Sequence, residues 1–235
     1  MVTKVFKRMW TEDVGLTGLL VILFLETFAI YPFVDSNTGS LVMHLIFLMI
    51  LITGVMAVSR KPRWACIVAM IAVAGLGFRY WGHMNPSQTA VIVNVGLRAF
   101  FAAMLITVIL MHVFRGGPVN RHRISGSIAV YMLIGALFAY LYFIIVTLDP
   151  GAFSIDVSLF NNDPHRLMAK LFYFSYITMS SVGFGEIVPS SPAACTLSML
   201  QALIGQLFPA VLLARLVSLE IEDSHMKRRS QETDE

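Results

Sequence analysis

Charged residues are scarce in this chain. Asp, Glu, Lys and Arg account for 13% of its 235 residues, against about 25% in soluble domains. Hydrophobic residues account for 57%, and the mean hydropathy is +0.75. Cysteine is rarer still: Cys66 and Cys195 are the only two, which gives neither a disulfide framework nor the spacing of metal ligands. The composition therefore excludes an ordinary water-soluble enzyme.

Long polar stretches are also lacking. No segment outside the apolar runs is long enough to fold as an independent soluble domain, and the residues after 221 are too few for a ligand-sensing domain. No internal repeat with a period of roughly 20 to 50 residues occurs. We expect no catalytic activity and no cofactor, because no catalytic or phosphate-binding motif is present. The function is therefore expected to lie within a bilayer.

Apolar runs fill most of the chain. Six of them reach about 20 residues, the length that crosses a bilayer as a helix, and they cover residues 15–34, 41–58, 64–81, 89–114, 126–148 and 193–221. A shorter apolar stretch, 167–179, lies between the last two runs. Asp163 and Pro164 precede it as cap and first-turn residues, and glycines follow it. This stretch predicts a re-entrant helix.

Basic residues gather in alternate short loops, and this sets the orientation. Twelve of the 17 Lys and Arg residues precede the first run, follow the last one, or lie in the second–third and fourth–fifth connections. By the positive-inside rule this side is cytoplasmic, so both termini are inside a plasma (inner) membrane. The same placement explains the net charge of +3 without a nucleic-acid partner. Residues 1–12 alternate apolar and basic faces and predict an interfacial helix on anionic lipids, with a frayed basic terminus as the alternative.

The segment after the predicted re-entrant helix carries the chemistry. Residues 181–185 read Ser-Val-Gly-Phe-Gly, and non-helical backbone at membrane depth is tolerated only where protein or a watery cavity satisfies it. Gly183 and Gly185 permit conformations that turn successive carbonyls toward one axis. Rings of carbonyls replace the hydration shell of a monovalent cation. One loop supplies one carbonyl per level, so the sequence predicts a homotetramer.

Residues 178–189, Thr-Met-Ser-Ser-Val-Gly-Phe-Gly-Glu-Ile-Val-Pro, resemble a known signature. It is Thr-Met-Thr-Thr-Val-Gly-Tyr-Gly-Asp-Ile-Val-Pro of potassium channels in the pore-loop (tetrameric cation channel) superfamily. Ser181, Phe184 and Glu186 replace its threonine, tyrosine and aspartate, and the Ser-Val-Gly-Phe-Gly form is also found in ether-a-go-go related channels. The resemblance covers roughly 126–221, and the last run is most similar to bacterial members with a two-helix pore module.

The resemblance implies roles for individual residues. The carbonyls of Ser181, Val182, Gly183 and Phe184, with Gly185 completing the loop and the Ser181 hydroxyl at the inner end, form the K⁺ sites. Phenylalanine lacks the hydroxyl that tyrosine gives to the surrounding pore helix, so faster filter inactivation is expected.

Other residues around this loop are assigned from position. Glu186 forms an acidic ring at the outer mouth or supports the filter from behind. Gly205 falls where such channels have a hinge, and Pro209 predicts a kink four residues later. Gln206 faces the cavity, and Leu213 with Val217 closes the cytoplasmic exit; lipid-facing or intersubunit positions are the competing interpretation.

Two charges lie deep within apolar runs. Glu26 and Arg98 sit at matching depths of about 16 Å from the inner side, at 1.5 Å per helical residue, and such charges are costly unless paired. We therefore predict an ion pair, as a structural contact rather than a sensor. Arg98 is also the only Lys or Arg in 91–112, whereas voltage sensors need several arginines, so voltage dependence should be weak or absent.

The sequence thus predicts an all-α membrane protein with six transmembrane helices, a re-entrant pore helix and a selectivity-filter loop, assembled as a homotetramer. Its function is passive, potassium-selective conduction; the alternatives are a nonselective cation channel and a nonconducting modulatory subunit. The expected segments are an interfacial helix, a four-helix peripheral domain, a pore domain and a short cytoplasmic tail, at 1–12, 13–123, 124–221 and 222–235.

Overall fold

The structure is a computed structural model, and it describes residues 17–28, 50, 87–114, 121–155 and 164–233. The predicted interfacial helix, most of the run 41–58 and all of the run 64–81 lie outside these residues. The described part of the chain is helical, with one isolated β-bridge and no strand. The all-α prediction is therefore confirmed for this part of the chain.

Most of the described residues lie in five helices: Thr17–Phe28, α4 (Gln88–Val113), α5 (Arg121–Leu148), α6 (Pro164–Met179) and α7 (Pro192–Thr233). Three are long and apolar enough to cross a membrane, over Gln88–Met111, Arg123–Leu148 and Pro192–Ile221. The last helix continues beyond its apolar part, so much of the segment expected as a tail is helical.

Serine and proline residues explain where these helices begin. The Ser87 hydroxyl accepts a hydrogen bond from the Ala90 N–H at 3.2 Å, and the Ser191 hydroxyl accepts one from Ala194 at the same distance. Both are N-caps, which satisfy a backbone donor that has no helical partner. Pro164 opens α6, at the position where its missing N–H costs nothing.

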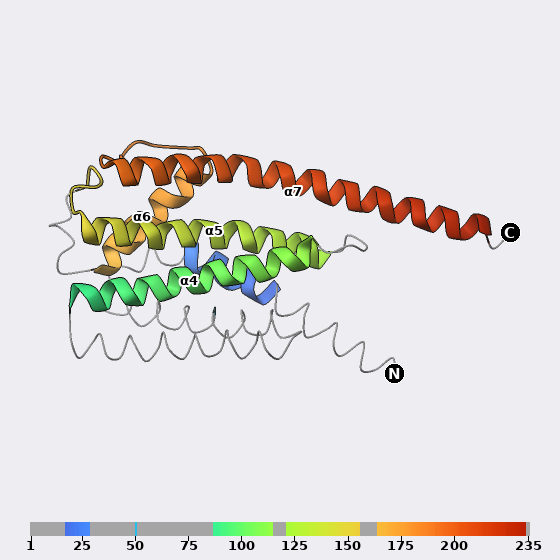
Figure 1. The fold of residues 1–235 in the computed structure, drawn as a ribbon, viewed down its shortest axis with the longest axis horizontal. Coiled ribbons are helices and arrows are strands. Elements are labelled where there is room, and N and C mark those ends of the chain that lie inside the picture. The colour runs from blue at the N-terminus through green and yellow to red at the C-terminus, as the bar shows by residue number, and fades with distance from the viewer. Residues whose placement is uncertain (1–16, 29–49, 51–86, 115–120, 156–163, 234–235) are drawn as a thin grey trace.

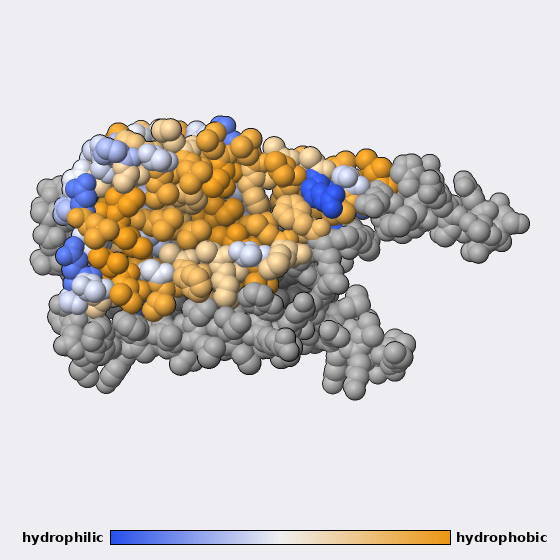
Figure 2. All heavy atoms as spheres, in the orientation of Figure 1, coloured by the Kyte–Doolittle hydropathy of each residue, from blue (hydrophilic) through white to orange (hydrophobic). Residues whose placement is uncertain are grey.

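The described helices pack in layers around α5. Helices α4 and α5 lie side by side, α7 runs along the opposite side of α5, and the short α6 crosses between α5 and α7 (Figure 1). Within the spanning windows, 67% of α5 is buried but only 11% of α7. Figure 2 shows that the visible face is apolar over most of the described helices, with hydrophilic residues gathered where α5 ends and α7 begins. Helix α5 is therefore central, and α7 presents most of its surface outward.

Aromatic side chains fix α6 against α5. The rings of Tyr142 on α5, Phe174 on α6 and Phe153 in the connection meet edge to face, with centroids 5.1–5.5 Å apart. Such pairs contribute about 0.5–1.5 kcal/mol each beyond the burial of their area. Nearer the carboxyl end of α6, the Tyr176 hydroxyl donates a hydrogen bond to the Met132 carbonyl at 2.9 Å and accepts one from Thr27 at 3.2 Å. The Tyr176 ring is thus held in place from two helices.

This packing predicts opposite effects for two glycine substitutions. A Cβ at Gly135 would lie 2.5 Å from Cε1 of the held Tyr176 ring, whereas a Cβ at Gly96 meets nothing within 4 Å. We expect Gly135→Ala to lower the stability of the detergent-purified protein by about 1–3 kcal/mol through overpacking. Gly96→Ala should leave it unchanged or raise it by up to about 1 kcal/mol. Thermal unfolding of both variants measures this, and equal shifts would contradict the packing.

Candidate functional site

The loop between α6 and α7 returns to the end from which α6 starts. Phe153 and Pro189 form an antiparallel bridge. Beside it, the Ser154 N–H donates to the Val188 carbonyl at 2.8 Å, and the Val188 N–H donates to the Ser154 hydroxyl at 2.9 Å. The chain before α6 is therefore tied to the chain after the loop, so 164–188 forms an excursion that is closed at its base.

The first loop residues cap the carboxyl end of α6. The Ser181 N–H donates to the Thr178 carbonyl at 3.1 Å and the Val182 N–H donates to the Ile177 carbonyl at 2.9 Å, while Ser181 has φ of 60°. This pair of bonds around one left-handed residue is a Schellman motif, in which glycine is usual. A serine there costs about 1–2 kcal/mol in backbone conformation. The direction of the loop is thus set by the end of the helix.

Left-handed residues then alternate along the loop. Ser181, Gly183 and Gly185 have φ of 60°, 54° and 82°, whereas Val182 and Phe184 do not have positive φ. Alternation of this kind turns successive peptide groups the same way, so that N–H groups share one side and carbonyls the other. A Cβ at Gly183 or Gly185 would meet no atom within 4 Å. Glycine is therefore required at these two positions by the positive φ of the backbone, and not by a lack of room for a side chain.

The side chains of loop residues 181–186 are exposed in the single chain. The Phe184 ring stacks parallel to Tyr173 of α6, with centroids 6.5 Å apart and planes 7° apart. Glu186 is exposed and Ile187 is buried. The loop thus contacts α6 through ring stacking, and one aliphatic side chain just after it is buried.

A buried hydrogen-bond network joins α5, α6 and α7 behind the loop. The Tyr142 hydroxyl donates to Oε1 of Gln201 at 2.7 Å, and Nε2 of Gln201 donates to the Ser175 hydroxyl at 2.6 Å and to the Ser175 carbonyl at 3.0 Å. The Ser175 hydroxyl donates in turn to the Gly135 carbonyl at 2.6 Å. This network was not predicted from the sequence. The signal that could have indicated it is Gln201, a polar residue within the apolar run 193–221, five residues before Gln206.

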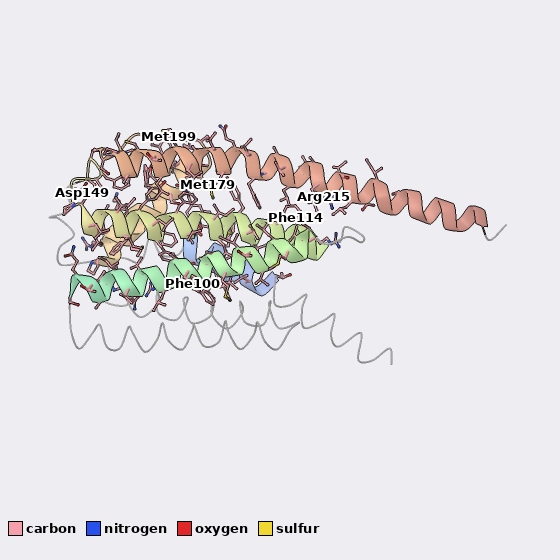
Figure 3. The ribbon with its side chains drawn as sticks, viewed as in Figure 1. Phe100, Phe114, Asp149, Met179, Met199 and Arg215 are labelled. Atoms are coloured by element: carbon pink, nitrogen blue, oxygen red, sulfur yellow. The ribbon has the colours of Figure 1, made fainter. Side chains whose placement is uncertain are left out.

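The end of α6 packs directly on α7. Met179 lies between α5 and α7 (Figure 3), and its carbonyl is in contact with the Cβ position of Gly205. The Tyr131 hydroxyl of α5 donates to the same carbonyl at 3.4 Å. Close approach therefore explains why position 205 has no side chain. The next residue, Gln206, donates from Nε2 to the Ser181 hydroxyl at 3.1 Å, so two predicted site residues meet.

Helix α7 has one face turned inward and the other outward. Residues with less exposure include a stripe toward α5 and α6: Gln201, Gly205, Phe208, Leu212, Leu216 and Leu219. Leu213 and Val217 follow Gln206 by about two and three turns and lie on its face, exposed. Pro209 is also exposed, inside an uninterrupted helix. Arg215, labelled in Figure 3, is on the opposite side of the helix from Gln206.

The two intramembrane charges come together away from the loop. Glu26 and Arg98 line one small cavity with Tyr140, and the Glu26 carboxylate interacts electrostatically with Arg98 and accepts a hydrogen bond from Tyr140. Glu26 is buried. Its neighbour Thr27 donates to the Tyr176 hydroxyl of α6 at 3.2 Å. The helix Thr17–Phe28 therefore contacts α6 and also lines the cavity. Among the described residues, no group of His, Cys, Asp and Glu forms a metal site.

Comparison with known families bears on the same segment. Residues 155–222 match the model of a family described as ion channels. This segment is similar to an ion channel. The matched residues include α6, the loop and the apolar part of α7, so the similarity falls on the elements assembled above. The match supports an ion-transporting membrane protein. No curated protein and no solved structure is significantly similar to the chain.

The buried network predicts a stability defect for Gln201→Leu. The change removes the acceptor of the Tyr142 hydroxyl and the donor to Ser175, at a cost of about 1–3 kcal/mol. The matched control is Thr196→Val on the same helix, because the exposed Thr196 hydroxyl bonds only to the Pro192 carbonyl of its own helix. Thermal unfolding should separate the two variants. Gln201→Leu combined with Tyr142→Phe should cost less than the sum of the single changes, and simple additivity would contradict the contact.

The charged cavity predicts coupling between Glu26 and Arg98. Arg98→Leu leaves the buried Glu26 carboxylate without the charge of Arg98, and Glu26→Gln removes that carboxylate from beside the half-buried Arg98, so each alone should reduce the yield of folded protein strongly. The double variant should recover part of that loss. Size-exclusion profiles of the four proteins in detergent measure it, and losses that simply add would exclude the ion pair.

Proposed function

We propose that the chain forms a homotetrameric, potassium-selective channel that conducts K⁺ passively across the plasma (inner) membrane. The observation that carries this proposal is the alternating left-handed backbone at residues 181, 183 and 185, in a closed excursion within the segment that matches ion channels. Such a backbone presents consecutive carbonyls on one side, as a bare cation requires.

The geometry of the loop supports an assembly of several copies, which we propose is a tetramer. One copy presents one carbonyl per level, so several copies around an axis are needed to surround an ion. The loop side chains and the outer face of α7 are exposed in the single chain, which supports an interface there between copies. In this assembly α6 is the re-entrant pore helix, and its carboxyl end points its partial negative charge toward the central cavity.

The direction of Gln206 assigns the face of α7 that lines the pore. Because Gln206 contacts Ser181 at the inner end of the loop, we assign the cavity to its face, with Leu213 and Val217 as an apolar constriction that closes by dewetting. The contact of Gly205 with Met179 holds the helix above this point, so the hinge lies below it, at Pro209. Arg215 then faces away from the axis, toward lipid headgroups.

Gating by voltage should be weak. Arg98 is the only Lys or Arg of α4, and it lines the cavity with Glu26, whereas steep gating moves several charges per subunit across the field. The four exposed Glu186 side chains would form an acidic ring at the outer mouth, on the side opposite the cytoplasmic termini, and concentrate cations there.

Reconstitution in planar bilayers tests the proposal. With K⁺ on one side and Na⁺ on the other, the current should reverse near the K⁺ equilibrium potential and show little dependence on voltage. Gly183→Ala should abolish this selectivity, because alanine resists φ near +54°, while Gly96→Ala should preserve it. Reversal near zero would indicate a nonselective pore, and no current from folded tetramers would indicate a modulatory subunit.

A further inference from the structure

The hydroxyl oxygen of Ser181 can accept two hydrogen bonds, and a side chain of the same protein already supplies one of them. Nε2 of Gln206 donates to it at 3.1 Å. A hydroxyl oxygen carries two lone pairs, and a cation at the inner end of the loop has to use the same oxygen. A cation bound there would lie beside a polarised amide N–H whose positive end repels it, so the amide and the cation do not both stay on this oxygen.

The position of Gln206 on α7 is set by two contacts of residues that precede it. Gly205 packs on the Met179 carbonyl, and Gln201, one and a half turns earlier, is tied to Ser175 and Tyr142. These contacts fix both the height and the rotation of α7 relative to the end of α6. The packing of the helix therefore places the backbone of Gln206 where its side-chain amide reaches Ser181.

We propose that Gln206 is a specificity-determining residue that competes with dehydrated cations for the Ser181 hydroxyl oxygen at the inner end of the loop. This inference rests on the proposed channel function. When no ion is present, the amide satisfies the hydroxyl. When a cation enters, the amide hydrogen bond must break, so the innermost site binds cations more weakly than the carbonyl sites above it. Weak binding at the exit of a multi-ion path favours release into the cavity.

Barium is the probe, because it is a divalent cation of nearly the size of potassium and binds such sites more tightly. Four full-length proteins are compared: wild type, Gln206→Met, Ser181→Ala and the double variant. Methionine keeps the length of glutamine but has no N–H donor. Block of the potassium current by barium from the cytoplasmic side gives an affinity for each protein, and barium calorimetry on the detergent-purified tetramers gives it without conduction.

Gln206→Met should raise the barium affinity by about three- to tenfold, the factor that corresponds to the net value of one hydrogen bond. Ser181→Ala should lower the affinity, and in that background Gln206→Met should have no effect. Equal affinities for wild type and Gln206→Met would overturn the proposal. An equal gain in both backgrounds would overturn it as well, because the amide would then act without the hydroxyl.

The two readouts separate this inference from the proposed function. Wild-type protein without a potassium-selective current contradicts the channel, whatever calorimetry shows. A selective, barium-blocked current with no coupling between positions 181 and 206 contradicts only the role of Gln206. Should Gln206→Met fail to give folded tetramers by size exclusion, Gln206→Ala replaces it in the same cycle with the same expected direction.

Discussion

The contact between the Met179 carbonyl and Gly205 determines how α7 crosses the end of α6, and the rest of the site depends on it. A side chain at 205 would push the two helices apart. With the helices in contact, the loop starts from a capped helix end, and the next residue of α7 reaches the first loop hydroxyl. The backbone of the loop and the face of α7 beneath it are thus aligned by one missing Cβ.

Polar groups within a bilayer have no water with which to form hydrogen bonds. In this chain they are paired with one another at two separate places on α5. Tyr142 joins Gln201 and Ser175 on the side of α7, while Tyr140 joins Glu26 and the charge of Arg98 toward the first helix. Two tyrosines two residues apart thus serve different neighbours. The central helix α5 links the charges near the helix Thr17–Phe28 to α6 and α7 through its own side chains.

Much of this arrangement could be predicted from local signals. Proline at 164 and glycines at 183 and 185 predict the start of α6 and the positive φ values, because both depend on the residue itself. Glu26 and Arg98 could be matched by depth, because a buried charge has few acceptable partners. The partners of Gln201 could not be predicted, since a buried amide has many, and the choice depends on how α5, α6 and α7 pack. Gly205 was predicted as a hinge, and only the structure adds the neighbour that requires a glycine there.

The pairing of α4 with α5 inside one chain has a consequence for mixed assemblies. These two helices run antiparallel and lie side by side, so each copy carries its own peripheral helices, and in the proposed tetramer only the loop and α7 are shared around the axis. A defective loop in one copy would disrupt every ring of carbonyls and be dominant over three normal copies. A defect beside Glu26 would stay within its own copy, and its effect would grow with the number of defective copies.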